Sequence, residues 1–160
     1  MDSGKFWRWA RLVLNISPHL EQHDEQELIQ SLVSSRRFAI VPELRIGHGS
    51  KFLVEAVLKA VCEGTTSKLK SLFIWNTQGS TDAALLSRAS VKVEKFTLRS
   101  EQTSKMQLQF ILTAVVESGD LALKTLDLGY KNNLAGISPE ILGGAAMRLE
   151  TLRVRPLNSC

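Results

Sequence analysis

The sequence predicts an α/β solenoid in which strand–helix units stack, with a parallel sheet on the concave face and helices behind it. Two observations carry this prediction. The motif apolar-x-x-apolar-x-apolar occurs six times, and its last positions are 32, 28, 24, 30 and 26 residues apart. Segments with apolar residues at helical spacing lie between the copies. Because one strand–helix unit cannot bury its apolar face alone, such units are stable only when stacked.

The six motif copies are the expected strands of a single domain that spans residues 1–160. Three copies agree beyond their apolar positions, since Leu-Lys-Ser-Leu, Leu-Lys-Thr-Leu and Leu-Glu-Thr-Leu share a charged residue and a hydroxyl. Helices are thicker than strands, so stacking should curve the sheet with its strands on the concave side. The expected strands are 9–14, 41–46, 69–74, 93–98, 123–128 and 149–154.

The segments between the strands carry helix start and stop signals. Residues 24–27, Asp-Glu-Gln-Glu, have capping-box spacing before an apolar stripe. Ser50 is the expected N-cap of a helix over 51–62, and Gly64 is its expected stop. The remaining helices are expected at 81–89, which is the shortest, from Thr103 or Ser104 to Gly119, and from Ser138-Pro139-Glu140 onward.

Composition and charge restrict the class of protein. The 160 residues are 44% hydrophobic and 22% charged, as in an ordinary globular domain. The net charge is only +4 and the longest basic run is Arg36-Arg37, so a mixed surface is favoured over nucleic-acid binding. Cys62 and Cys160 form no C-x-x-C pair, which favours a reducing compartment, the cytoplasm or the nucleus. No apolar stretch reaches 18 residues, so we expect no membrane span.

No pattern in the sequence points to catalysis. A nucleophile-elbow motif and a glycine-rich phosphate loop are both missing from the sequence. Gly143-Gly144 is interpreted as a place of close packing. His19 and His23 stand four residues apart without a third ligand, so a solvated face is favoured over a metal site. We therefore expect no enzyme activity, no cofactor and no metal.

The motif and its period resemble the leucine-rich repeats of the ribonuclease-inhibitor-like group, over about residues 9 to 155. The resemblance implies a protein-binding solenoid. One departure concerns the turns, because the family usually places Asn or Cys three residues past the last apolar position. Here Ser17, Gly49, Thr77, Glu101, Lys131 and Leu157 stand there, with Asn76, Asn132 and Asn158 beside three of them.

The N-terminal segment carries a second resemblance. Phe6-Trp7-Arg8-Trp9-Ala10-Arg11-Leu12 resembles the end of an F-box, where an aromatic-rich tail leads into leucine-rich repeats. This implies the substrate-receptor part of a ubiquitin-ligase adapter, whose ligase scaffold would bind an F-box lying upstream. The alternative is that residues 1–8 form a cap, with Trp7 and Trp9 covering the open end of the solenoid.

The strand phase predicts a partner-binding surface on the concave face. If Leu72 and Ile74 point into the core, Phe73 and Trp75 point out, because strand side chains alternate. Aromatics flanked by arginines are enriched in binding hot spots. The alternative is that Phe73 or Trp75 folds over a neighbouring loop. We expect a protein-interaction module with a protein partner of unknown identity and no membrane partner. Its candidate partner-binding residues are Arg45, Phe73, Trp75, Arg99, Asp127, Tyr130 and Arg153, which Arg155 and Thr97 extend.

Overall fold

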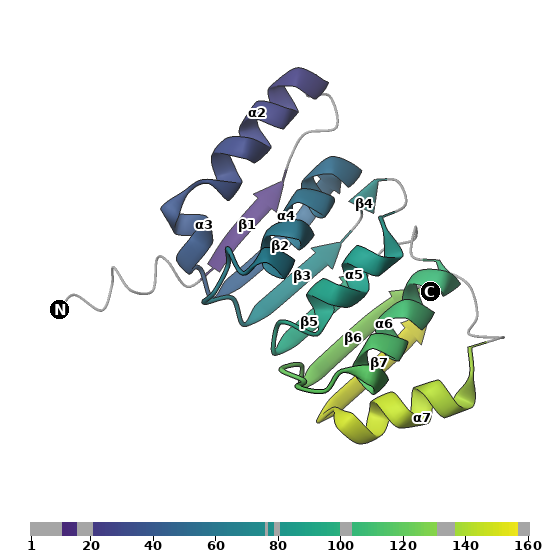
Figure 1. The fold of residues 1–160 in the computed structure, drawn as a ribbon. Helices are drawn as coiled ribbons and strands as arrows, with labels where there is room; N and C mark the ends of the chain where they lie inside the picture. The colour runs from purple at the N-terminus through teal and green to yellow at the C-terminus, as the bar shows by residue number, and fades with distance from the viewer. Residues whose placement is uncertain are drawn as a thin grey trace.

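The computed structural model describes residues 11–15, 21–75, 77–78, 81–99, 104–130 and 137–156. Strands and helices alternate along the chain (Figure 1). The strands are β1 (Arg11–Asn15), β2 (Glu43–Ser50), β3 (Ser71–Trp75), β4 (Thr77–Gln78), β5 (Lys95–Arg99), β6 (Thr125–Tyr130) and β7 (Thr151–Pro156). The helices are α2 (Gln22–Val33), α3 (Arg36–Ile40), α4 (Lys51–Glu63), α5 (Ala83–Ser90), α6 (Lys105–Glu117) and α7 (Pro139–Arg148).

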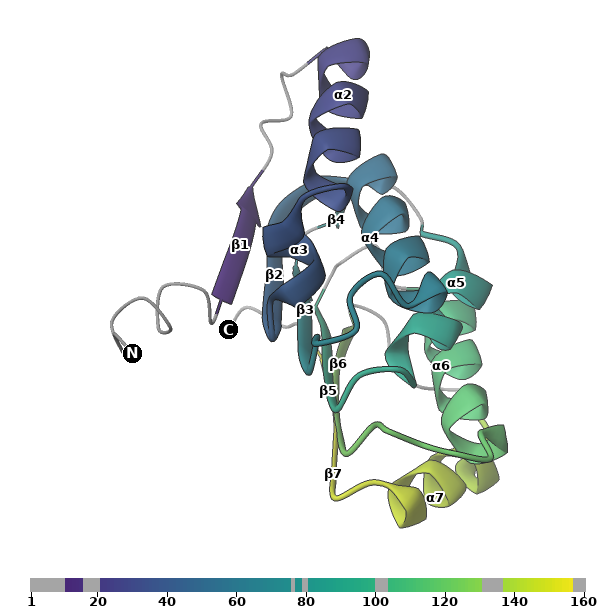
Figure 2. The ribbon, with the colours of Figure 1, turned by 60° about the vertical axis from the view of Figure 1, so that its left-hand side comes forward.

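The strands form one parallel sheet in the order β1-β2-β3-β5-β6-β7, while β4 pairs separately with β2. The order follows the chain, so each strand–helix unit lies beside the one before it. The helices all lie on one side of this sheet and leave its other side uncovered by described elements (Figures 1 and 2). The predicted α/β class, with alternating strands and helices and a parallel sheet, is therefore confirmed.

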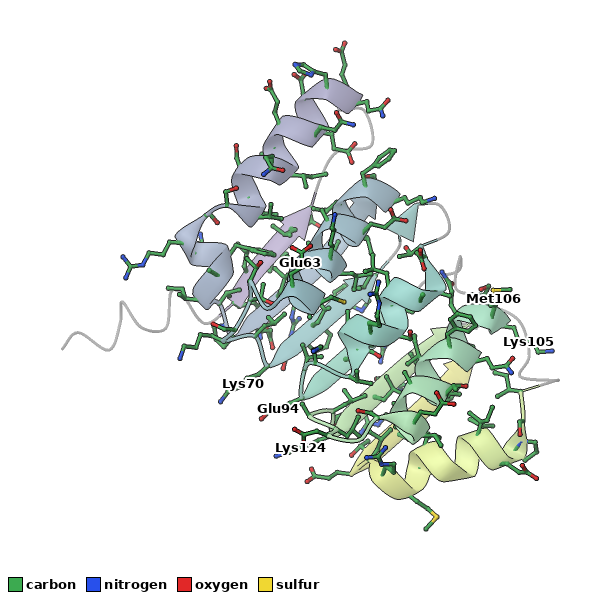
Figure 3. The ribbon with its side chains drawn as sticks, in the orientation of Figure 1. Glu63, Lys70, Glu94, Lys105, Met106 and Lys124 are labelled. Carbon is green, nitrogen blue, oxygen red and sulfur yellow. The ribbon has the colours of Figure 1, made fainter. Side chains whose placement is uncertain are left out.

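A repeated hydrogen bond joins consecutive units where the strands begin. The carbonyl oxygen of Lys70 accepts bonds from the backbone N–H groups of Glu94 and Lys95, both at 2.9 Å. Equivalent carbonyls each accept from the two residues that start the next unit, and these carbonyls belong to Pro42, Lys70, Glu94 and Lys124. Figure 3 shows Lys70, Glu94 and Lys124 following one another along this edge. The repeat of the motif in the sequence thus corresponds to a repeat of these backbone hydrogen bonds in the structure.

Strands β2, β3, β5, β6 and β7 each begin two residues later than predicted, while residues 9 and 10 of the first predicted strand lie outside the described residues. The reason is that the first apolar residue of each motif comes before the turn, as Leu69 does, and is buried there ahead of the strand. The other four described residues of this kind, Val41, Val93, Leu123 and Leu149, are also buried. The motif therefore starts with a turn anchor and continues as a strand.

The core lies between the sheet and the helices. The inward residues of the four central strands are Leu44, Ile46, Leu72, Ile74, Phe96, Leu98, Leu126 and Leu128, and none is more than 3% exposed. Helix α4 adds Leu53, Val54, Val57 and Leu58, while α6 adds Leu108, Ile111, Leu112 and Val115. The predicted inward phase of the strands is thus confirmed.

Three of the predicted helix signals hold as expected. Ser50 caps α4 by accepting a bond from the Leu53 backbone N–H at 3.2 Å, and Gly64 ends that helix at φ 82°, where a glycine is favoured. Ser104 and Gln107 form a capping box at the start of α6. Its end was predicted wrongly, since α6 stops at Glu117 and the following backbone is extended before Gly119 is reached.

The predicted capping box at residues 24–27 is also wrong. Helix α2 begins at Gln22, so Asp24 and Glu25 lie inside its first turn instead of ahead of it. The buried Glu25 carboxylate accepts a hydrogen bond from the Ser50 hydroxyl, which ties α2 to the start of α4. At α7, Ser138 precedes Pro139 as predicted but makes no capping bond through its side chain.

Candidate partner-binding face

The side of the sheet opposite the helices is the candidate site, and we call it the open face. Strand pairing lines up its outward side chains in rows that cross the strands. The middle row contains Val13, Arg45, Phe73, Thr97, Asp127 and Arg153. The row toward the strand ends contains Trp75, Arg99, Gly129 and Arg155, and the row toward the strand starts contains Arg11, Glu43, Ser71, Lys95, Thr125 and Thr151.

An aromatic pair occupies the β3 part of the open face. Phe73 and Trp75 are successive outward positions, and their ring centroids lie 6.2 Å apart in an edge-on arrangement. The Arg45 guanidinium stands 4.5 Å from the Phe73 centroid and 5.9 Å from that of Trp75. Lys95 approaches the Phe73 ring to 5.3 Å from β5. Both rings are half-buried, and Arg45 and Lys95 together cover part of the Phe73 ring.

An arginine pair, Arg99 and Arg155, occupies the β5–β7 part of the open face. Their Nη2 groups both donate to Oδ2 of Asp127, at 3.1 Å and 2.9 Å. Gly129 lies in register between the two arginines, so no side chain separates them on that row. The Asp127 side chain is 9% exposed, whereas those of Arg99 and Arg155 are 40% and 50% exposed. The carboxylate thus holds two partly exposed guanidinium groups in place.

Three buried polar atoms on the open face have no hydrogen-bond partner among the described residues. They are Oδ1 of Asp127, the hydroxyl of Thr97 and the indole Nε1 of Trp75. Thr97 and Asp127 are paired in register on neighbouring strands. Buried polar groups are normally satisfied, so this face has hydrogen-bonding capacity that the described part of the chain leaves unused.

The open face is strongly basic. Its described side chains include six basic residues against two acidic ones, an excess of four, which equals the +4 of the whole chain. The acidic residues are Asp127 and Glu43, and Glu43 contacts Arg11 and lies 3.2 Å from Arg45. Among the described residues, the positive charge is therefore concentrated on one side of the sheet.

The structure brings together most of the residues predicted for this surface. Arg45, Phe73, Trp75, Arg99 and Asp127 are linked by the contacts above, and the exposed Arg153 pairs in register with Asp127. The Tyr130 backbone ends β6 opposite Pro156, but its side chain lies outside the described residues.

Sequence reasoning did not select Glu43 or Lys95 for the site. Glu43 lies two positions before Arg45, and Lys95 lies two positions before Thr97, so all four side chains point outward. The alternation of side chains along a strand could therefore have identified both residues.

Other groups with chemical potential lie away from this face. His23 contacts Glu27 at 3.3 Å on α2, and His19 lies outside the described residues. Within the described ranges, no cluster of three or more His, Cys, Asp or Glu side chains could hold a metal ion. Burial raises the pKa of the Cys62 thiol. Of the helices that the structure describes, none has the length and apolar character needed to cross a membrane.

Comparison of the chain with protein families, with curated proteins and with solved structures finds no match. The candidate site therefore has to be interpreted from its own geometry.

Proposed function

We propose that this chain is a protein-interaction module that binds a partner protein on the open face of its sheet. The observation that carries the proposal is the half-buried Phe73–Trp75 pair beside guanidinium groups that are fixed by Asp127. Tryptophan, tyrosine and arginine are the residues most enriched in binding hot spots. Groups already held in place lose less conformational entropy when a partner binds.

The repeated unit supports the leucine-rich-repeat form of this proposal. Stacked repeats would place strands on one side and helices on the other. They would also bring the turn carbonyls of consecutive units together at the spacing of the sequence motif. In such an arrangement the strand side chains form a continuous binding surface, the predicted concave face. We place its action in a reducing compartment, the cytoplasm or nucleus, because the two cysteines form no pairing motif.

The test is quantitative affinity capture from cell extract with three forms of the chain. Phe73→Ala/Trp75→Ala removes the aromatic pair, and Phe52→Ala/Phe110→Ala removes two exposed aromatics from the helix side as the matched control. We expect the intact chain and the control to retain the same protein and the Phe73/Trp75 variant to lose it. Circular dichroism is used to check that all three forms are folded. Equal retention by all three forms would contradict binding through the open face.

The ubiquitin-ligase adapter is a second candidate, supported by the resemblance of residues 6–12 to the end of an F-box. Residues 1–10 lie outside the described part of the chain. The two candidates differ in what the same capture experiment recovers. Recovery of ligase-scaffold subunits that persists in the Phe73→Ala/Trp75→Ala variant would favour the adapter, because the scaffold would be bound elsewhere than on the open face.

A further inference from the structure

We infer that the partner segment bound by the open face is acidic, and that Arg99 and Arg155 hold one of its carboxylates. This inference rests on the proposed function, since it names the chemistry of the segment that the same face would bind. It starts from the N–H donors that the arginine pair does not use toward the described residues. A guanidinium carries five N–H donors. Within the described ranges, each arginine bonds to Asp127 through its Nη2 group alone.

The arrangement of the arginine pair suits a single carboxylate. Both Nη2 atoms bond the same oxygen, Oδ2 of Asp127, at 3.1 Å and 2.9 Å, so one incoming carboxylate can reach both guanidinium groups. Gly129 leaves the row between them without a side chain. The half-exposed state of both arginines leaves room for an incoming group.

The local charge balance favours the binding of an anion. Asp127 supplies one negative charge to a cluster of three arginines, since the exposed Arg153 stands beside it in register on β7. Two positive charges therefore remain uncompensated within this cluster. Arg45 and Lys95 add positive charge over the neighbouring aromatic pair, where Glu43 compensates for only part of it.

The position of Trp75 fixes a second feature of the segment. Trp75 is paired in register with Arg99, and neighbouring strands lie about 4.8 Å apart. An extended peptide that crosses the strands advances about 3.3 Å per residue. A segment whose acidic side chain lies on the arginine pair would thus place an apolar side chain one to three residues away against the half-buried Trp75.

Two observations favour an acidic peptide over a nucleic acid. The Phe73 ring already has Arg45 and Lys95 over it, so a stacking base would have to displace them. Glu43 and Asp127 lie on the same face and would repel a phosphate backbone, which carries a charge at every nucleotide. A peptide can place its few carboxylates where the arginines are.

The experiment selects random twelve-residue peptides, displayed on phage, against the immobilised chain at low salt. We expect the retained sequences to be enriched in Asp and Glu, with an apolar residue one to three positions away. A retained peptide and its copy with Asn and Gln in place of the acids are then measured by fluorescence anisotropy. Replacing the acids should weaken binding at least tenfold, and added salt should weaken the acidic peptide alone.

Variants of the chain then test whether the peptide binds at the arginine pair. Arg99→Gln/Asp127→Asn/Arg155→Gln removes the pair without leaving Asp127 uncompensated, and each lost arginine should lower affinity about tenfold. Arg153→Gln, which changes an exposed residue, should also weaken binding. Arg88→Gln/Lys92→Gln removes two exposed charges on the helix side and should leave affinity unchanged.

Distinct results separate this inference from the proposed function. Peptides that are not acidic, but lose binding in Phe73→Ala/Trp75→Ala, would overturn the inference and leave the proposed function standing. If nothing is enriched, or if the peptides ignore both sets of open-face variants, both fail. A labelled twenty-nucleotide oligothymidylate is measured in parallel. Its tighter binding through Arg99 and Arg155 at physiological salt would overturn the peptide assignment in favour of a nucleic acid.

Discussion

The inward and outward positions of the same strands differ in how much their residue types vary from strand to strand. Inward positions repeat one chemistry from β2 to β6, with only Leu, Ile and Phe in the core rows. Outward positions change from strand to strand, and Arg45, Phe73, Thr97 and Asp127 stand at equivalent positions in one row. A stacked architecture dictates the inward residues, because every unit must bury the same kind of surface. It leaves the outward residues open to selection for binding.

The difference extends to how polar groups are treated. On the inward side, the apolar side chains of the central strands leave no polar side chain in the sheet's core rows. On the open face, Thr97 and Asp127 are buried, and each has an oxygen without a hydrogen-bond partner among the residues that the structure describes. A structure built only for stability would not retain such atoms, since a buried unsatisfied group costs free energy. The comparison therefore assigns the stabilising core to one side of the sheet and supports the proposal that a partner binds on the other.

The sharpest test of this division compares neighbours on β3. Leu72→Ala removes a fully buried side chain and should lower the free energy of unfolding by about 2–5 kcal/mol. Phe73→Ala, one residue further, removes a half-buried ring and its cation contacts and should cost about 1 kcal/mol. Urea unfolding followed by circular dichroism measures both. Equal costs would mean that the open face is as important for stability as the core.

The exception on the open face is Asp127. Asp127→Ala removes the acceptor of two charge-assisted bonds and should cost about 1.5–3 kcal/mol in the same assay. Thr125→Ala, an outward substitution on the same strand, serves as its control and should cost about 0.5 kcal/mol or less. If Asp127→Ala costs no more than Thr125→Ala, the carboxylate does not fix the arginine pair and the preorganisation argument fails.

The sequence predicted the inward side of the sheet well and the open face only in part. Periodicity identified the strands and their phase, because burial repeats with the unit. The strand starts were two residues off, since the motif does not distinguish the turn anchor, such as Leu69, from the strand. The shared role of Arg99 and Arg155 could not be predicted in the same way. Both reach Asp127 diagonally across the sheet, and not from the positions paired with it in register.

Cys62 marks the border between the core and the helix side. It packs partly buried against the core, and desolvation raises the pKa of its thiol. The thiolate is the reactive form, so at pH 8 iodoacetamide should alkylate Cys62 more slowly than an exposed cysteine in a short peptide. The rate should rise with pH, with a midpoint above that of the peptide thiol. Mass spectrometry of the Cys62 peptide measures both rates, and a midpoint at or below that of the peptide would contradict burial of the thiol.

The smallest expected effect concerns the exposed charges at the strand starts. The equivalent turn positions in consecutive units are occupied by Lys70, Glu94, Lys124 and Glu150, so the charges alternate along this edge. Figure 3 labels the first three of them. Lys124→Glu places three like charges in succession and should cost about 0.5 kcal/mol at low salt. Lys68→Glu, an exposed charge reversal outside this series, is the control and should cost less.

Salt decides whether the cost of Lys124→Glu is electrostatic. At 1 M salt the Debye length is about 3 Å, so repulsion between these exposed groups should almost disappear. Adding Glu150→Lys to Lys124→Glu restores an opposite-charge neighbour at this edge and should recover part of the lost stability. A cost that persists in salt and in the double variant would show that Lys124 stabilises the turn by packing. In that case the residues at this edge would be determined by packing in the repeated unit, as on the inward side of the sheet. Their alternating charges would then contribute no stability.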